Sequence, residues 1–371
     1  MKPDKYFSIV VGILIIILAI IPTGFENPNL TDSVLFEKAK VLDVDNSDIQ
    51  AISVTVIGTQ YLSLLVKSGQ FAGDTIQATN VLLGQKKTDK IFEAGDKVLA
   101  VIQLDTTKTK YISARADEYY RQNIELVLLI CFGLFLILFA KFTGFKALLS
   151  FIFTALALWK LLIPLYLKGY SPIMVALGVV ILTSTVIILL VGGLNKKGVV
   201  ALLGTIAGIC FTALLAIIFG RFFKIPGTVQ EYSEALLYSG FTTLDFSDML
   251  ISTIFISAAG AVMDVSMDIS SAQHEIQNRL PDLPRHELII SGFRISAPVI
   301  GSMTTTLLFA YSGSFLFAFM AFMAKGVPFE SILNTGYIAA EILHTLVGSF
   351  GLVLVAPLTA VIGGIVYSKR G

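Results

Sequence analysis

Residues 246–268 read FSDMLISTIFISAAGAVMDVSMD, and this stretch decides how the rest of the chain is interpreted. It is apolar and long enough to cross a membrane, yet it contains Asp264 and Asp268. An ionised group in hydrocarbon costs about 2.5 to 3.5 kcal/mol on insertion scales, so carboxylates there indicate function rather than packing against lipid. Residues four apart on a helix share one face about 6 Å apart, and repulsion favours a proton on at least one. The stretch predicts a polytopic membrane protein with a site, around Ser266, for a proton or small cation.

Composition supports a membrane protein and excludes a nucleic-acid-binding one. The mean hydropathy is +0.81, and 14% of residues are charged, against about a quarter in soluble proteins. The formal net charge of +1 comes with no long basic run, so nucleic acid is not an expected partner. The lipid bilayer is the expected surrounding. Cys131 and Cys210 both fall in apolar segments and predict no disulfide framework.

Windows of about 20 apolar residues predict about eight membrane-spanning helices. They lie near residues 6–24, 124–142, 146–167, 172–194, 198–220, 246–269, 295–324 and 344–367. With the N-terminus inside, the inner segments hold Lys2, Lys5, Lys141, Lys146, Lys196, Lys197, Arg279, Arg285, Arg294, Lys369 and Arg370. The short outer loops hold only Lys168, Arg221, Lys224 and Lys325. The positive-inside rule therefore predicts that both termini are cytoplasmic.

The polar segment 28–122 then lies outside the cytoplasm and reads as a small β-domain. Short runs alternate β-branched and polar residues at 52–56 and 75–78, and a further run covers 97–102. Glycine-rich turns such as 69–74 separate them, as between the strands of a small closed OB-like or SH3-like barrel. Residues 115–122 read as a short helix leading into the second span. The predicted organisation is an N-terminal anchor over 1–27, the β-domain over 28–122 and a helical bundle over 123–371.

Small residues precede the two carboxylates on their helix. Ser257, Ala258, Gly260 and Ala261 let neighbouring helices approach closely, so Asp264 and Asp268 are expected to point into the bundle. The competing interpretation places both carboxylates at the cytoplasmic interface, where they are only hydrated.

Lys160 lies within the third predicted span, and two interpretations of it stay open. It is a natural counter-ion for the aspartates. The rise of 1.5 Å per residue, however, places it near the outer side of the membrane, while Asp264 lies in the inner third. A side chain that extends to the outer interface fits that depth better.

Residues 295–324 would form a helix of about 45 Å, which is longer than a hydrocarbon core of about 30 Å. Pro298, Gly301 and Gly313 are candidate breaks. A broken helix would present hydroxyl groups from Ser302, Thr304, Thr305 and Thr306 along a substrate or ion path. A tilted, kinked but continuous helix is the alternative.

Glu341 and His344 have the Glu-x-x-His spacing of carboxylate-bridged metal sites. A single copy predicts no metal centre, and a role at the start of the last span is the plainer interpretation. No Ser/His/Asp arrangement and no phosphate-binding loop is present in the sequence. We therefore expect neither an enzyme nor a bound cofactor.

Several stretches together resemble the YibE/F-like family of multispan bacterial membrane proteins. They are GAVMDVSMDISS (260–271), GSMTTTLLFAY (301–311), GSFGL (348–352) and PLTA (357–360), together with the N-terminal anchor and the β-domain. The resemblance implies a location in the bacterial cytoplasmic membrane and no substrate. Many family members carry an Arg-Asp pair where this chain has Ala297-Pro298, and an Asn where it has Thr305.

These observations favour a transporter-like protein in which Asp264 and Asp268 bind a proton or small cation. The segment 295–324 would line the path. The competing function is a non-transporting receptor or scaffold of the cell envelope, whose β-domain binds a partner. A paralogous membrane subunit, or further copies of this chain, is an expected partner because such a subunit would supply the missing Arg-Asp pair.

Overall fold

The computed structural model describes residues 3–25 and 33–368, and the chain divides into two compact units. One unit covers residues 25–135, and the other combines residues 1–24 with 136–371. The first unit holds the strands, and the second holds most of the helices.

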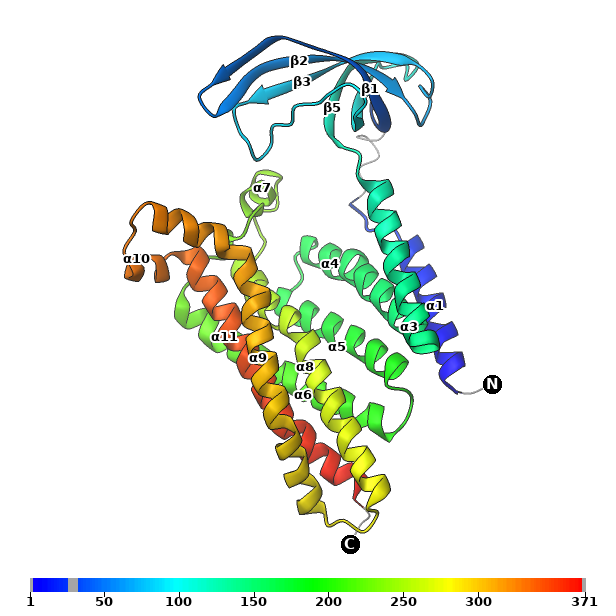
Figure 1. The fold of residues 1–371 in the computed structure, drawn as a ribbon, viewed down its shortest axis with the longest axis vertical. Coiled ribbons are helices and arrows are strands. Elements are labelled where there is room, and N and C mark those ends of the chain that lie inside the picture. The colour runs from blue at the N-terminus through cyan, green and yellow to red at the C-terminus, as the bar shows by residue number, and fades with distance from the viewer. Residues whose placement is uncertain (1–2, 26–32, 369–371) are drawn as a thin grey trace. The chain divides into compact units, whose positions relative to one another are not determined.

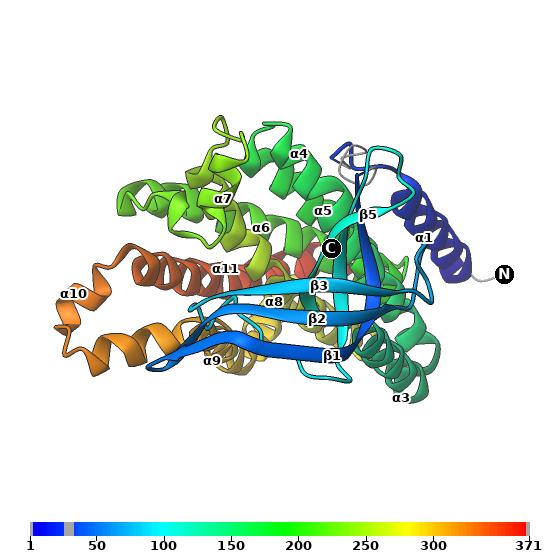
Figure 2. The same ribbon diagram turned by 90° about the horizontal axis from the view of Figure 1, so that it is seen from above.

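The strands form a closed five-stranded barrel in the order β1-β2-β3-β5-β4. Their bounds are β1 Val34–Ile52, β2 Thr55–Val66, β3 Thr75–Leu83, β4 Lys97–Leu104 and β5 Tyr111–Tyr119. Figure 2 shows β1, β2 and β3 running side by side. Neighbouring strands are antiparallel except β3 and β5, which pair in parallel at Thr79 and Arg115.

Side chains of the barrel alternate between its interior and its surface. On β3 and β4 every second residue is buried, and the interior is filled by residues such as Leu62, Leu64 and Ile102. Gln60 is a buried polar exception. Its amide nitrogen donates to the Phe92 carbonyl at 3.1 Å, and its oxygen accepts from Phe92 N at 3.0 Å. These two bonds fasten the connection between β3 and β4 to the barrel.

Two sequence predictions for this domain are wrong in detail. Residues 52–56 are not one strand, because Ser53 has a φ of 54° and forms the turn between β1 and β2. Residues 115–119 are strand rather than helix. Ala114 and Ala116 point into the barrel, where pairing with β4 outweighs the helix propensity of this stretch. The predicted strands at 75–78 and 97–102 are confirmed within β3 and β4.

The helices of the second unit begin with α1, Pro3–Ile20, and continue after the barrel. They are α3 Gln122–Ala157, the π-helix η1 Leu158–Leu162, α4 Ile163–Leu167, α5 Pro172–Val191, α6 Lys196–Phe223, α7 Ser233–Tyr238, α8 Phe246–Arg279, α9 Arg285–Ala324, α10 Phe329–Leu333 and α11 Gly336–Tyr367. A short 3₁₀ segment, η2, covers Gly227–Val229. Residues 122–135 of α3 belong to the first unit. Figure 1 shows α8 within a bundle with α5, α6, α9 and α11.

Within residues 3–25 and 33–368, six helical segments are long and apolar enough to cross a membrane, compared with about eight predicted from sequence windows. Two predicted spans, 124–142 and 146–167, belong to one helical run over 122–167, which Lys141 interrupts with a φ of 52°. The predicted N-terminal span is a shorter apolar helix over 5–20. Several apolar helices are thus present, and their number depends on how such interruptions are counted.

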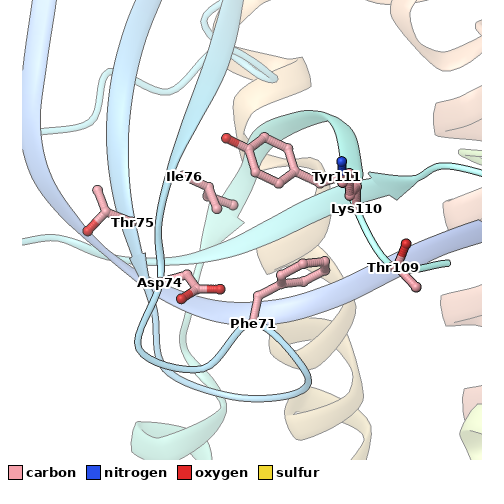
Figure 3. Close-up of a pocket in the computed structure, with 7 residues that line it drawn as sticks. All are labelled: Phe71, Asp74, Thr75, Ile76, Thr109, Lys110 and Tyr111. Atoms are coloured by element: carbon pink, nitrogen blue, oxygen red, sulfur yellow. The ribbon is translucent and has the colours of Figure 1, made fainter.

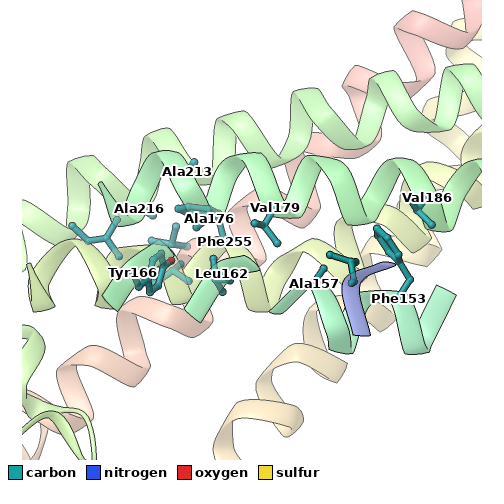
Figure 4. Packing of buried hydrophobic residues seen from close by; sticks show 14 of the residues in the cluster. Phe153, Ala157, Leu162, Tyr166, Ala176, Val179, Val186, Ala213, Ala216 and Phe255 are labelled. Atoms are coloured by element: carbon teal, nitrogen blue, oxygen red, sulfur yellow. The ribbon is translucent and has the colours of Figure 1, made fainter. Parts of the chain in front are cut away.

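The buried core of the bundle joins helices that are far apart in sequence. Figure 4 shows Phe153, Tyr166, Val179 and Phe255 in one apolar cluster, to which α3, α4, α5 and α8 contribute. Close helix contact elsewhere depends on glycine. A Cβ atom on Gly208 would lie 2.8 Å from side-chain atoms of Val262 on α8 and Val355 on α11. Small residues thus set the spacing of α6, α8 and α11.

The segment for which the sequence left a broken and a kinked helix open is one helix. α9 is helical from Arg285 to Ala324 and contains Pro298, so no half-helices form. Figure 1 shows that its C-terminal part, next to α10, runs in a different direction from the rest. The continuous, bent helix is therefore correct.

Candidate functional site

The helix that carries the two aspartates lies among four others. α8 packs against α5, α6, α9 and α11. The Asp245 side chain accepts a hydrogen bond from Asp248 N at 2.9 Å and so caps its first turn. The helix ends at Arg279, two residues before Pro281, which cannot continue a helix. These local signals fix the length of α8, and its neighbours decide which face is buried.

The inward face of α8 carries buried polar groups that join helices. Ser266 is fully buried, and its hydroxyl donates to the Ala201 carbonyl of α6 at 2.7 Å. The same oxygen lies 3.0 Å from Thr359 Oγ1 on α11. Ser266 therefore holds α6, α8 and α11 together, and the structure places it in a helix contact rather than on an open path.

Gln273 extends this inward face by two turns. Its amide nitrogen donates at 3.0 Å to the carbonyl of Leu288 on α9 and at 3.0 Å to that of Ala360 on α11. Ser270, between these turns, donates to the Lys197 carbonyl of α6 at 2.8 Å. Hydroxyl and amide donors of this column, Ser266, Ser270 and Gln273, bond to carbonyls of neighbouring helices and stabilise the bundle, while Oε1 of Gln273 is buried without a hydrogen-bond partner among the described residues.

Asp264 and Asp268 lie on the opposite face and are exposed, so the expectation that both point into the bundle is wrong. The reason is the helical period. The inward face is already occupied by Val262, Ser266 and Ile269, and Asp264 lies two residues, about 200°, from both Val262 and Ser266. The carboxylates therefore lie on the other side of α8 from Ser266.

The aspartates continue a line of exposed residues along α8. We define the α8 stripe as Ser257, Gly260, Asp264 and Asp268, all of which are exposed. Met263 and Met267 flank it and pack in one cluster with Ile188 of α5 and Ala201 of α6. A Cβ atom on Gly260 would meet nothing within 4 Å, so the stripe is open at its middle.

A second set of polar side chains lies beside the N-terminal end of the α8 stripe, at Ser257. Ser257 Oγ is 3.0 Å from Nε2 of His344 on α11. The other ring nitrogen, Nδ1, is 3.9 Å from a carboxylate oxygen of Glu341. The Tyr311 ring of α9 stacks on the His344 ring at a centroid distance of 5.2 Å. Three helices thus contribute to this group of Ser257, Tyr311, Glu341 and His344, which we call the histidine cluster.

Sequence reasoning did not identify Ser257 or Tyr311 as partners of His344. On α8, Ser257 lies seven residues, about 10 Å, from Asp264. No spacing in the sequence signals a contact between residues 87 positions apart. Within residues 3–25 and 33–368, no three His, Cys, Asp or Glu side chains gather as a metal site would require.

The α9 hydroxyl groups that were predicted to line a path form hydrogen bonds to backbone carbonyls of their own helix. Ser302 donates to the Val299 carbonyl at 3.0 Å, and Thr306 donates to the Ser302 carbonyl at 3.1 Å. Thr304 and Thr305 donate to the Ile300 and Gly301 carbonyls at 3.0 and 3.4 Å. These bonds satisfy hydroxyl donors on a continuous helix, and the structure does not join them to the α8 stripe.

Lys160 lies in the π-helix η1, and its ammonium donates to the Ile21 carbonyl at 3.0 Å. Ile21 directly follows α1, so the lysine side chain holds the end of that helix. For the described residues, the structure records no ion pair between Lys160 and either aspartate of the α8 stripe. In this structure the Lys160 side chain therefore stabilises the C-terminal end of α1.

The barrel has a surface pocket of its own. It has a volume of about 540 Å³ and is lined by Phe71, Asp74, Thr75, Ile76, Thr109, Lys110 and Tyr111. Figure 3 shows the Phe71 and Tyr111 rings close to each other above the strands, and their centroids are 6.2 Å apart. The aromatic rings of Phe71 and Tyr111 thus lie in the same pocket as the charged side chains of Asp74 and Lys110.

Fold and site together define a class of protein. The chain is mostly helical, has several helices apolar enough to cross a membrane, and carries a small five-stranded barrel near its N-terminus. These features are compatible with a membrane protein. The sequence profile described as "YibE/F-like protein" matches residues 128–369, which are most of the chain. The chain therefore belongs to the YibE/F-like family, and the resemblance seen in its motifs is confirmed.

The matched residues include all of the α8 stripe and the histidine cluster. The barrel strands, residues 34–119, lie outside the match. No curated protein and no solved structure gives a significant match to the chain.

Proposed function

We propose that this protein is an integral membrane protein of transporter type, and that Asp264 and Asp268 bind a proton or small cation. Carboxylates suit protons and hard cations, and charged groups in membrane-spanning helices usually mark such pathways. The exposure of both aspartates on an apolar helix supports this proposal, because a lipid-facing position would be costly for them. Contact with water or with a group of opposite charge would remove that cost.

The observation that carries the proposal is the contact between Ser257 and His344. It connects the α8 stripe to the histidine cluster, so that polar groups continue from Asp268 through Asp264 and Ser257 to Glu341. From Asp268 to Ser257 the helix rises about 16 Å, roughly half of a 30 Å hydrocarbon core. Histidine is the side chain best suited to pass a proton near neutral pH. This row of carboxylate, hydroxyl and imidazole groups has the composition that a proton or cation path requires.

The proposal includes an orientation. The bias of lysine and arginine toward alternate loops supports cytoplasmic termini and an extracytoplasmic barrel. The membrane in this proposal is the bacterial cytoplasmic membrane, which the resemblance of the sequence motifs implies.

Flux measurements on the purified full chain in proteoliposomes test the proposal. A pH-sensitive dye inside the vesicles reports proton movement, and Na⁺, K⁺ and Mg²⁺ gradients are imposed separately. We expect wild-type protein to move at least one of these ions and Asp264→Asn to abolish most of that movement. Asp282→Asn is the matched control, because Asp282 is an exposed carboxylate in the loop between α8 and α9. Ion movement by Asp264→Asn at the wild-type rate, or none by wild-type protein, contradicts the proposal.

The barrel pocket supports a second function, a non-transporting receptor or scaffold. Its closed strand order and its apolar floor beside Asp74 and Lys110 suit a binding module of OB type. Complementation of a deletion strain separates the two functions. Loss of complementation by Lys110→Ala combined with silence of Asp264→Asn favours the receptor, and the reverse result favours transport.

A further inference from the structure

Arg294 is a charged residue that neither the α8 stripe nor the histidine cluster uses. It lies ten residues into α9, within a helix apolar enough to cross a membrane. Its side chain is exposed. Arg294 is also among the residues counted in the inner segments, so it lies near the inner end of this helix, where an arginine that packs against another helix is stabilised by a partner of opposite charge.

Arg294 lies at nearly the same level as Asp268 on the neighbouring helix. Gln273 of α8 donates to the Leu288 carbonyl of α9, and a Cβ atom on Gly292 would lie 2.5 Å from the same amide nitrogen. Gln273 is therefore level with a point between residues 288 and 292. The two helices run in opposite directions, so a step toward the N-terminus of α8 corresponds to a step toward the C-terminus of α9. Asp268 precedes Gln273 by five residues and is therefore level with about residue 295 of α9. Arg294 is one residue, about 1.5 Å along the helix axis, from that level.

The two side chains nevertheless do not meet within one copy of the chain. The packed face of α9 contains Leu288, Gly292 and Ser296, which are buried. Arg294 lies two residues from Gly292 and from Ser296, about 200° around the helix, so it points away from that face. Among the residues that the structure describes, no ion pair joins Arg294 to Asp264 or Asp268.

We infer that the exposed faces of α8 and α9 form a two-fold interface with a second copy of this chain, in which Arg294 of each copy pairs with Asp268 of the other. A two-fold axis along the membrane normal keeps every residue at its own depth, so two groups level within one copy are also level between copies. The contact is then reciprocal and closes without repeating further. This inference does not depend on transport.

The surface around these charges suits close helix packing. On α9 the outward residues near Arg294 include Ala297 and Gly301, and a Cβ atom on Gly301 would meet nothing within 4 Å. Gly260 of the α8 stripe is open in the same way. Small residues that let backbones approach are typical of helix interfaces in membranes. Ile290 and Phe293, 43% and 41% exposed, add apolar surface beside the arginine.

Charge reversal in two differently tagged full-length copies tests this interface. One copy carries Arg294→Asp and the other carries Asp268→Arg. A homodimer of either variant sets like charges against each other at both contacts. In the mixed dimer, the introduced aspartate faces the introduced arginine at one contact, and the native Arg294 and Asp268 meet at the other. Only co-expression should therefore restore the dimer.

The dimer fraction is measured by light scattering after size exclusion in mild detergent, and the mixed dimer by sequential capture of the two tags. We expect a wild-type dimer, a dissociation constant at least about tenfold higher for each variant alone, and a mixed dimer close to wild type. Arg285→Asp, at the exposed start of α9, is the matched control and should dimerise normally. If charge reversal prevents folding, Arg294→Gln and Asp268→Asn test the same pairs with a smaller shift.

Four results would overturn the inference, three of them from the dimerisation experiment itself. Those three are a monomeric wild-type protein in native membranes, single variants that dimerise as well as wild type, and a failure of the co-expressed variants to form the mixed dimer. Purification as a complex with a different membrane subunit, without a homodimer, would also overturn it.

Discussion

Ser257 Oγ lies 3.0 Å from Nε2 of His344, although the two residues are 87 positions apart in the chain. This contact joins α8 to α11 beside the Tyr311 ring of α9. It also places a titratable imidazole at the end of the α8 stripe. The histidine cluster and the two aspartates are thereby parts of one polar surface.

Loss of the Ser257 hydroxyl should weaken the link between α8 and α11. We expect Ser257→Ala to lower the free energy of unfolding by about 1 kcal/mol, the usual net value of one hydrogen bond. Thermal unfolding in detergent, followed by the fluorescence of Trp159, measures this change. Ser302→Ala is the control, because Ser302 bonds only a carbonyl of its own helix at 3.0 Å. Equal effects of both substitutions would show that the contact with His344 adds no stability.

Gly204 should tolerate no side chain. A Cβ atom there would overlap Thr359 Oγ1 on α11 and lie 2.5 Å from Ser266 Oγ on α8. Overpacking of a tight core costs about 1 to 3 kcal/mol, so Gly204→Ala should lower the unfolding temperature clearly. Gly260→Ala changes the same residue type at an open position and should leave that temperature unchanged or slightly raised. A normal melting temperature for Gly204→Ala would contradict this packing.

Gln273 should contribute more to stability than a glutamine four residues further along the same helix. Gln273→Ala removes two interhelical hydrogen bonds, to Leu288 and Ala360, and leaves a cavity between α8, α9 and α11. We expect a loss of about 2 kcal/mol. The side chain of Gln277, which is partly buried, donates only to the nearby Pro281 carbonyl at 2.8 Å, so Gln277→Ala serves as the control. Comparable melting temperatures for the two variants would argue against this contact.

The turn between β4 and β5 should loosen in acid. Hydrogen bonds from the Thr107 hydroxyl and from the backbone NH groups of Lys110 and Thr109 hold the pKa of Asp105 below its ordinary value of 3.8. A folded-state pKa below the unfolded one stabilises the turn above pH 3.8, and this contribution is lost as the pH falls through the folded value.

Hydrogen exchange of residues 105–110, corrected for intrinsic rates and compared between pH 6 and pH 3, measures that loss. We expect protection to fall with pH in wild-type protein, and to be low and nearly independent of pH in Asp105→Asn. Asp43→Asn, at an exposed carboxylate of β1, is the control and should behave like wild type. The same acid-induced loss in Asp105→Asn would assign it to another group.

Hydropathy and turn residues were sufficient to predict the helical bundle and the small barrel. Apolar runs of about 20 residues identify candidate spans regardless of what packs on them, and glycine-rich turns such as 69–74 separate strands wherever the strands lie. The local sequence pattern gave wrong predictions where two kinds of secondary structure have the same pattern. The alternation at 52–56 continues through the turn at Ser53, and residues 115–119, which were predicted as part of a helix over 115–122, pair with β4.

The sequence by itself determined that Asp264, Ser266 and Asp268 lie within one apolar helix, because hydropathy and helical period are properties of adjacent residues. Only the tertiary structure decided that Ser266 joins α6 and α11 while the two aspartates face outward. It also decided that His344 meets Ser257. The physical reason is that the period of a helix defines its faces, but which face is buried depends on the helices that pack against it.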